Sequence, residues 1–142
     1  WTNKNFKSQL LSDAKAAISS IGIDLETQSE IVVVENTPAI HNVIVCTLCS
    51  CYPRFLLGQP PTWYKSVAYR SRTVFEPREV LREFGTNLSE KVQIRVHDSN
   101  ADLRYMVLPM KPEGTDNWSK DRLEAIVSRD SLVGVALPAA NV

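Results

Sequence analysis

The chain has 142 residues, the length of one domain or of one subunit of a larger assembly. Its apolar fraction of 44% and charged fraction of 23% are typical of a folded globular protein, and 16 basic residues balance 16 acidic ones. Because neither half carries a basic surplus, we expect no nucleic-acid partner and no binding to an anionic membrane surface. No apolar run is long enough to span a bilayer and no leader is visible, so we expect a cytoplasmic protein.

The first third of the chain is expected to hold one helix and two strands. Apolar residues recur at spacings of three and four, and Gly22 follows the last of them, which predicts an amphipathic helix over 1–22. Two runs rich in β-branched residues, 31–34 and 43–45, predict strands. The second run leads directly into a cluster of cysteines, which we therefore expect in a loop at the end of a strand.

Helical patterns dominate the middle of the chain. They cover 63–66 and 69–84, and Pro77 is expected to open a new helix inside the second stretch, because proline suits the first helical turn. Further along, Ser119 is a suitable N-cap for another amphipathic helix.

Three strands are expected in the second half. Residues 92–97 alternate apolar and polar side chains, and 103–108 form their expected partner, joined by a short turn. The apolar run 133–137 is expected to be a last strand. Strands and helices thus follow one another in mixed order, which favours an α+β fold over a doubly wound sheet.

All three cysteines of the chain, Cys46, Cys49 and Cys51, fall within six residues. Independent burial does not account for such clustering, and an odd number without a secretion signal argues against a disulfide framework. Metal binding remains. Zinc is the usual ion for clustered thiolates, and its structural sites need a fourth ligand, for which His41 and His97 are the candidates. A zinc-binding protein without catalytic activity is therefore one hypothesis.

The cysteine spacing also permits a different metal site. Cys49 and Cys51 flank Ser50, so both thiolates reach one ion only if the backbone folds tightly, which brings the peptide nitrogens of Ser50 and Cys51 close as well. If those amides lose their protons, the loop offers two nitrogens and two sulfurs in a plane, with Cys46 from below. Such donors suit a small trivalent ion and leave a sixth position open, as hydration chemistry requires.

The segment from Val45 to Pro53, VCTLCSCYP, resembles the metal-binding signature of the nitrile hydratase α subunit. The resemblance covers most of the chain and is carried further by segments 33–38, 41–42, 61–66, 104–105, 112–115 and 129–136. It implies a single domain over 1–142, with a helical N-terminal segment and a metal-binding globular part over 23–142, in a four-layered α-β-β-α fold. It also implies a partner β subunit that completes the active site.

The resemblance implies the metal ligands and the activity. The thiolates of Cys46, Cys49 and Cys51 and the amides of Ser50 and Cys51 would bind one ion, with Cys49 as sulfinate and Cys51 as sulfenate. Thr47, where iron-type members usually have Ser, implies low-spin Co(III), with Fe(III) as the alternative. The implied reaction is the hydration of a nitrile to its amide by a lyase, in which the Cys51 sulfenate, or a water that it activates, attacks the nitrile carbon. Ser50 is expected to act through its amide, and its hydroxyl is a further candidate.

Further site residues follow from the same resemblance. Asp98, Asp102 and Arg104 match positions that hold the metal loop and the subunit contact from outside the ligand set. A turn that is simply rich in aspartate is the alternative for the two carboxylates. Gln28 resembles a glutamine that lines the pocket.

Arg54 departs from the nitrile hydratase pattern, in which this position is usually tryptophan. A fixed cation beside the metal pocket would favour anionic or polar substrates, or pair with a neighbouring subunit. Together with segments 58–59, 93–96, 98–100 and 113–116, Arg54 also resembles the γ subunit of thiocyanate hydrolase. That relative uses the same cobalt loop to hydrolyse thiocyanate to carbonyl sulfide and ammonia, which is the second expectation for function.

Overall fold

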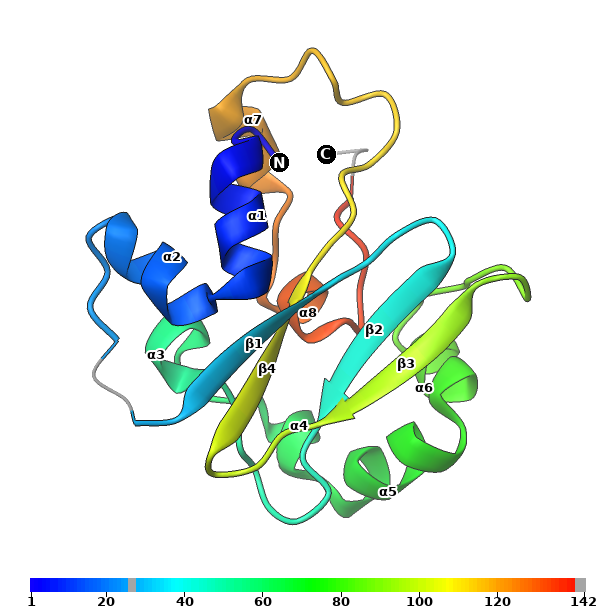
Figure 1. Cartoon of the computed structure of the whole chain (residues 1–142). Helices are drawn as coiled ribbons and strands as arrows, with labels where there is room; N and C mark the ends of the chain where they lie inside the picture. The colour runs from blue at the N-terminus through cyan, green and yellow to red at the C-terminus, as the bar shows by residue number, and fades with distance from the viewer. Residues whose placement is uncertain (26–27, 140–142) are drawn as a thin grey trace.

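The computed structural model describes residues 1–25 and 28–139 (Figure 1). Its elements, in chain order, are α1 (Lys4–Ser12), α2 (Ala14–Ser20), β1 (Glu30–Glu35), β2 (Ile40–Val45), α3 (Arg54–Leu57), α4 (Thr62–Lys65), α5 (Val67–Phe75), α6 (Pro77–Glu83), β3 (Gln93–Asp98), β4 (Leu103–Leu108), α7 (Lys120–Ala125) and α8 (Arg129–Val133). No helix in this described part of the chain has the length and apolar character needed to cross a membrane.

The strands form two sheets of two parallel strands each, β1 with β4 and β2 with β3. Figure 1 shows α1 and α2 beside the β1–β4 sheet and α5 and α6 beside the β2–β3 sheet, and contacts between β2 and β4 join the two sheets. The layers are therefore helices, sheet, sheet and helices. This order confirms the predicted α+β fold with an α-β-β-α arrangement.

Strand β2 lies in the larger of the two hydrophobic cores. Val43, Ile44 and Val45 are fully buried, and Tyr64 and Tyr69 belong to the same cluster. A continuous apolar run of this kind is typical of a parallel strand that is covered on both faces. The buried strand β2 ends at Val45, and the cysteine cluster begins at the next residue, Cys46.

The helix predicted over 1–22 is in fact two helices, α1 and α2, which meet at Asp13. Asp13 ends α1 in a non-helical conformation, and its carboxylate accepts the Ala16 N–H at 3.2 Å, which caps α2. The predicted apolar face is present on both helices and packs with Ile31 and Val33 of β1. The periodicity hides the break because Asp13 is exposed to solvent and carries no part of the apolar face.

The predicted pairing of 92–97 with 103–108 is wrong, although both strands exist, as β3 and β4. Each pairs in parallel with a strand from the first third of the chain, β3 with β2 and β4 with β1. In the turn between them, the Asn100 side chain accepts hydrogen bonds from the N–H groups of Asp102 and Leu103. This turn leads the chain from one sheet to the other. An alternating pattern predicts a half-buried strand, but it does not specify the neighbour.

The strand predicted over 133–137 is also wrong, because α8 extends into this segment. Ser128 and Ser131 cap α8 reciprocally, and Gly134 ends it in a left-handed conformation. The next N–H groups turn back to the carbonyl of Asp130. Val133 and Val135, which suggested a strand, therefore lie at the end of a helix and are buried in the core, whereas Leu137 is exposed.

The remaining helix predictions are confirmed. Segment 63–66 lies within and just after α4, and 69–84 is divided between α5 and α6. Pro77 occupies the first turn of α6, and the Ser119 hydroxyl accepts the Arg122 N–H at 3.2 Å at the start of α7.

Candidate metal centre

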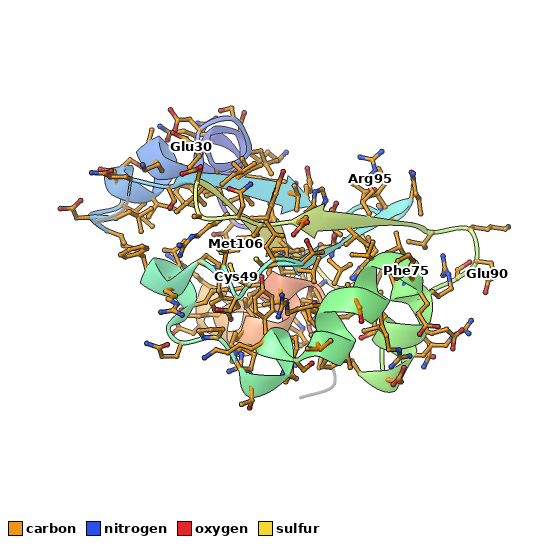
Figure 2. All side chains as sticks on the ribbon, turned by 90° about the horizontal axis from the view of Figure 1, so that it is seen from below. Glu30, Cys49, Phe75, Glu90, Arg95 and Met106 are labelled. Carbon is orange, nitrogen blue, oxygen red and sulfur yellow. The ribbon has the colours of Figure 1, made fainter. Side chains whose placement is uncertain are left out.

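The cysteine cluster directly follows the last residue of β2, at the edge where β2 and β3 both end. Cys46 and Cys51 are buried, whereas Cys49 is exposed. Figure 2 looks at the molecule from below and shows Cys49 near the centre of that view. One sulfur of the cluster is therefore open to solvent, and two are enclosed by the protein.

The three sulfur atoms converge. The Cys49 Sγ lies 3.5 Å from the Cys46 Sγ and 3.2 Å from the Cys51 Sγ, and all three lie within 4.8 Å of one another. The backbone N–H groups of Ser50 and Cys51 help to lower the pKa of Cys49, and the Cys49 N–H donates to the Cys46 sulfur at 3.3 Å. Sulfur atoms and peptide nitrogens of one short loop thus surround a common small volume.

Neither histidine of the chain joins this cluster. The His41 Nε2 lies 2.6 Å from the Gly134 carbonyl oxygen and its Nδ1 lies 3.3 Å from Asn36 Nδ2. The His97 Nε2 lies 2.7 Å from Asn42 Oδ1. In residues 1–25 and 28–139, the three cysteines are the one group of histidine, cysteine and carboxylate side chains close enough to hold an ion. Because a structural zinc site needs a fourth side chain, this donor set fits an ion that takes peptide nitrogen together with sulfur.

The contacts among the sulfurs separate the acidities of the thiols. Hydrogen bonds from Cys51 and then from Cys46 stabilise the Cys49 thiolate and lower the pKa of Cys49. Burial raises the pKa of Cys51 to about 12, and the neighbouring Cys49 adds to the rise. Thiolates, not thiols, bind metals, so Cys49 becomes a ligand more readily than Cys51, and an ion that binds Cys51 must displace its proton.

Two charged side chains hold the first half of the loop at Thr47. The Asp98 carboxylate accepts the Thr47 N–H at 2.9 Å and the Thr47 hydroxyl at 2.6 Å. Arg70 donates from Nε to the Cys46 carbonyl oxygen at 3.2 Å and from Nη2 to the Thr47 carbonyl oxygen at 2.8 Å. The sequence pointed to Asp98. It gave no signal for Arg70, which lies on α5 and belongs to no motif.

The second half of the loop is held through its backbone oxygens. The Tyr64 hydroxyl donates to the Cys51 carbonyl oxygen at 2.6 Å, and Arg104 Nη1 donates to the Tyr52 carbonyl oxygen at 2.9 Å. The buried Arg104 Nε has no partner among the described residues. Tyr64 is a second residue that the sequence did not single out, although it lies in a segment that carries the family resemblance.

A cavity of about 430 Å³ opens beside the cysteines. The residues that line it are Cys49, Ser50, Cys51, Arg54, Phe55 and Arg104. Two of these are arginines and none is acidic, so the cavity presents positive charge next to the exposed sulfur. Such a site favours small anionic or strongly dipolar ligands.

Two residues predicted for the site lie elsewhere. Gln28 and Asp102 are exposed, and neither lines the cavity. Within the described ranges no hydrogen bond or ion pair reaches the Asp102 carboxylate, while the Asp102 N–H donates to Asn100 Oδ1 at 2.8 Å. Neither side chain has a hydrogen bond to the cysteine loop in the part of the chain that the structure describes.

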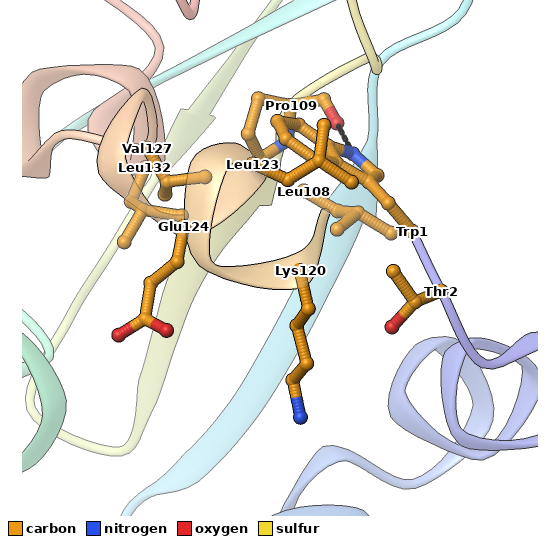
Figure 3. A pocket seen from close by; sticks show the side chains of 9 residues that line it. All are labelled: Trp1, Thr2, Leu108, Pro109, Lys120, Leu123, Glu124, Val127 and Leu132. Atoms are coloured by element: carbon orange, nitrogen blue, oxygen red, sulfur yellow. Dashed lines mark hydrogen bonds between the residues drawn. The ribbon is translucent and has the colours of Figure 1, made fainter. Parts of the chain in front are cut away.

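A separate cavity of about 340 Å³ lies between the N-terminal residues and α7 (Figure 3). Leucine, valine and proline side chains form most of its wall, and Trp1 Nε1 donates to the Pro109 carbonyl oxygen at 2.8 Å. One lysine and one glutamate are its charged residues, and none of its lining residues is a cysteine or a histidine. It offers none of the chemistry that gathers at the cysteine loop.

Comparison with known proteins gives one consistent result. The family model described as nitrile hydratase, alpha chain, matches residues 1–136. The low-molecular weight cobalt-containing nitrile hydratase subunit alpha of Rhodococcus rhodochrous is 51% identical over 138 residues, which cover 97% of this chain and 67% of that protein. Thiocyanate hydrolase subunit gamma of Thiobacillus thioparus is 45% identical over an alignment of 149 positions, and the alignment covers 97% of this chain and 61% of that protein.

Solved structures agree with the sequence comparison. A double mutant of the Fe-type nitrile hydratase from Comamonas testosteroni Ni1 superposes with a TM-score of 0.93 at 46% identity, covering 99% of this chain and 69% of that chain. A recombinant thiocyanate hydrolase with partially modified cobalt centres also gives a TM-score of 0.93, at 43% identity, covering 100% of this chain and 70% of that chain. The fold is therefore shared over essentially the whole chain.

Proposed function

The chain belongs to the nitrile hydratase α-chain family, and on that premise we propose that it is the metal-bearing subunit of an enzyme that hydrates a nitrile to its amide. The observation that carries the proposal is the convergence of three sulfurs and two peptide N–H groups beside an open cavity. The proposed ligands are the thiolates of Cys46, Cys49 and Cys51 and the amide nitrogens of Ser50 and Cys51. The proposed ion is Co(III), one per chain, as in the cobalt-containing relatives, with Fe(III) as the alternative because an Fe-type relative matches equally well.

The reaction adds one water across a carbon–nitrogen triple bond, and no electrons are exchanged. When bound, the trivalent ion would act as a Lewis acid that makes the nitrile carbon electrophilic. The chain supplies either the nucleophile or the base. We propose that the Cys51 sulfenate oxygen attacks the nitrile carbon and that a water then releases the amide and restores the sulfenate, or that the sulfenate takes a proton from the water that attacks, with Cys49 carried as sulfinate. The Tyr64 hydrogen bond to the Cys51 carbonyl holds this residue in place.

Arg104 completes the proposed site from the protein side. Its Nη1 is fixed on the Tyr52 carbonyl oxygen, and its buried Nε has no partner within residues 1–25 and 28–139. A buried donor without a hydrogen-bond partner costs free energy, so a hydrogen bond from it would stabilise an acceptor bound beside the loop. We assign that donor to an oxygen on an oxidised sulfur or on the bound substrate. Ser50 contributes its amide nitrogen, and the residue lines the cavity.

Thiocyanate is the second candidate substrate, and one observation favours it. The cavity has two guanidinium groups, Arg54 and Arg104, and no carboxylate, so an anion is attracted where an apolar nitrile is not. One thiocyanate and two waters give carbonyl sulfide, ammonia and hydroxide, again without a change of oxidation state. The similarity to thiocyanate hydrolase subunit gamma supports the same reading.

We propose that the chain acts as one domain over 1–142 and works with a β-type partner subunit. The exposed Cys49 and the open cavity support this, because a partner can close the site and exclude water from it. Asp102 is assigned to that subunit contact, and Gln28 to the wall of the pocket in the assembled enzyme. The proposed ligands are small molecules in the cytoplasm, with no role for nucleic acid or membranes.

The decisive experiment uses the chain produced together with its partner subunit in cobalt-supplemented medium. Elemental analysis is expected to give one cobalt per chain, and mass spectrometry of the peptide with Cys46 to Cys51 is expected to show two added oxygens on Cys49 and one on Cys51. Acrylonitrile and thiocyanate are then offered separately. Conversion of acrylonitrile to acrylamide supports the first proposal, and consumption of thiocyanate supports the second. Zinc with unmodified thiols and no turnover contradicts both and supports a structural zinc protein.

A further inference from the structure

The first half of the cysteine loop is fixed from two distant elements of the fold. Asp98, the last residue of β3, accepts hydrogen bonds from the N–H and the hydroxyl of Thr47. Arg70, in the middle of α5, donates hydrogen bonds to the carbonyl oxygens of Cys46 and Thr47. All the hydrogen-bonding groups of Thr47 are therefore occupied by two side chains of opposite charge. The loop has no such support at Leu48, whose side chain is 81% exposed.

Arg70 is itself held firmly. The neighbouring Tyr69 is buried and donates its hydroxyl to the Ile44 carbonyl oxygen at 2.6 Å, which fastens α5 to β2 beside the loop. At the start of the same helix, the Ser66 hydroxyl accepts the Tyr69 N–H at 3.1 Å as an N-cap. No carboxylate of the described residues pairs with Arg70. Its guanidinium is therefore committed to the loop and not to an ion pair.

The geometry of these two bonds explains why the residue is an arginine. The donors are different nitrogens of one planar guanidinium, and the acceptors are carbonyl oxygens of consecutive residues, at 3.2 Å and 2.8 Å. Two bonds from one rigid fork fix the orientation of both peptide groups between Cys46 and Leu48. Those two peptide groups determine how the Cys46 sulfur is placed relative to Cys49. A lysine ammonium is a point donor and cannot impose the same orientation.

We propose that Arg70 is a positioning residue for the metal centre: it holds Cys46 and Thr47 so that the three sulfurs converge before an ion arrives. This inference rests on the proposed function, because it assumes that the loop binds a metal. Side chains outside the ligand set that orient ligands typically change metal affinity by about 10-fold to 100-fold when they are removed. Arg70 acts on the ligand backbone, and so it touches neither ion nor substrate.

The test compares three variants of the complete chain without metal: Arg70→Met, Arg70→Lys and Arg72→Met. Arg72 is the matched control, since it lies on the same helix and its exposed guanidinium pairs with Glu76 and Glu83 instead of the loop. Each protein is titrated with Co²⁺ under anaerobic, reducing conditions, and binding is followed by the thiolate-to-cobalt absorption. Circular dichroism and thermal midpoints establish that each variant is folded. Hydrogen exchange of the backbone N–H groups over 46–52 is measured on the same samples.

Arg70→Met is expected to weaken Co²⁺ binding about tenfold or more, Arg70→Lys to recover part of the loss, and Arg72→Met to stay within about twofold of the parent chain. Arg70→Met is also expected to speed exchange over 46–52. A folded Arg70→Met protein with parental Co²⁺ affinity overturns the inference. If Arg70→Met does not fold, either parental affinity in Arg70→Lys or an equal loss of affinity in Arg70→Lys and Arg72→Met overturns it. If the parent chain binds no Co²⁺ while Arg70→Met still loosens the loop, the proposed function fails and the positioning of the loop by Arg70 stands.

Discussion

The Asp98 carboxylate accepts two hydrogen bonds from Thr47, one from the backbone N–H at 2.9 Å and one from the hydroxyl at 2.6 Å. The parallel register of β2 and β3 produces this contact, because Val45 and Asp98 lie opposite one another as the last residues of their strands. The chain therefore enters the cysteine loop beside the Asp98 carboxylate. Through these hydrogen bonds, the rigid end of the sheet holds the start of the cysteine loop in a fixed position.

Asp98→Ala is expected to lower the cobalt content of the purified chain about tenfold, because the Thr47 N–H and hydroxyl lose their acceptor and the loop loosens. Asp98→Asn should lose less, since its amide oxygen can still accept the N–H. Asp102→Ala is the control, as its exposed carboxylate has no contact with the loop. Elemental analysis of the three proteins measures the effect, and equal cobalt in Asp98→Ala and Asp102→Ala would argue against a role for Asp98.

Cys49→Ala and Cys51→Ala are each expected to abolish turnover and to remove most of the metal, because each deletes one of three converging sulfurs. Ser50→Ala is the matched control. It keeps the peptide nitrogen that we assign as a ligand, so it should retain cobalt. Any fall in its turnover then measures the contribution of the Ser50 hydroxyl. Retention of both metal and activity in either cysteine variant would show that the site is assigned to the wrong residues.

Arg54→Trp is expected to change substrate preference. It removes one of the two cations of the cavity and adds an apolar surface, so the ratio of kcat/KM for acrylonitrile to that for thiocyanate should rise about tenfold. Arg54→Lys, which keeps the charge, is the control and should leave the ratio near its starting value. Unchanged selectivity in Arg54→Trp would place Arg54 at the periphery of the pocket.

Gly134→Ala is expected to destabilise the fold by about 3 kcal/mol or more, through overpacking added to backbone strain. A Cβ at this position would lie 2.1 Å from the Asn42 carbonyl oxygen, which is backbone and cannot move aside, and the φ angle is +97°. Gly114→Ala is the control, because its φ of +78° costs strain but a Cβ there meets nothing within 4 Å. Urea denaturation of both variants compares the two costs. A similar loss in both would mean that strain, not the contact with Asn42, dominates.

Acid should destabilise the fold through His41. Asn36 Oδ1 accepts two N–H groups from Asn42, so its amide NH₂ group faces His41 Nδ1, and His41 Nε2 donates to the Gly134 carbonyl oxygen. This network requires neutral His41, and burial lowers the pKa of His41 below the ordinary 6.5. As the pH falls below 6.5, the unfolded chain takes up a proton that the folded chain does not, so stability present above this pH is lost.

The size of that loss is limited to about 1.4 kcal/mol per pH unit for each proton. Urea unfolding of the metal-free chain at about pH 7.5 and about pH 5.5 measures it. His41→Gln should be less stable than the parent at neutral pH but less sensitive to acid. Some sensitivity should remain, because burial, followed by the charge of Arg95, also lowers the pKa of His97. An unchanged pH dependence in His41→Gln would assign the effect to other groups.

Local sequence patterns predicted most of the elements, while the pairings and the supports of the loop required the structure. The strands at 31–34 and 43–45 and the helix opened by Pro77 follow from features within a few residues. The pairing of β3 with β2 does not, because an alternating pattern suits any neighbour that covers one face. The strand predicted over 133–137 was wrong for a related reason, since an apolar run is compatible with a buried helix end as well as with a strand.

The candidate site divides in the same way. Clustering alone identified the three cysteines, since their spacing brings them together whatever the rest of the fold does. Arg70 and Tyr64 contact the loop across gaps of 23 and 13 residues, and an arginine or a tyrosine in an amphipathic helix has no distinctive pattern. Their roles depend on how α4 packs against α5 and α5 against β2, which is a property of the whole core.

The pairing of β2 with β3 sets an order of events for the maturation of this protein. The carboxylate that secures Thr47 comes from a strand 51 positions further along the chain, so a growing polypeptide that has emerged only as far as the cysteines lacks it. The thiols are therefore synthesised first but gain their fixed arrangement late, once both strands have docked. A metal ion that binds the three arranged sulfurs therefore does so only after both strands have docked.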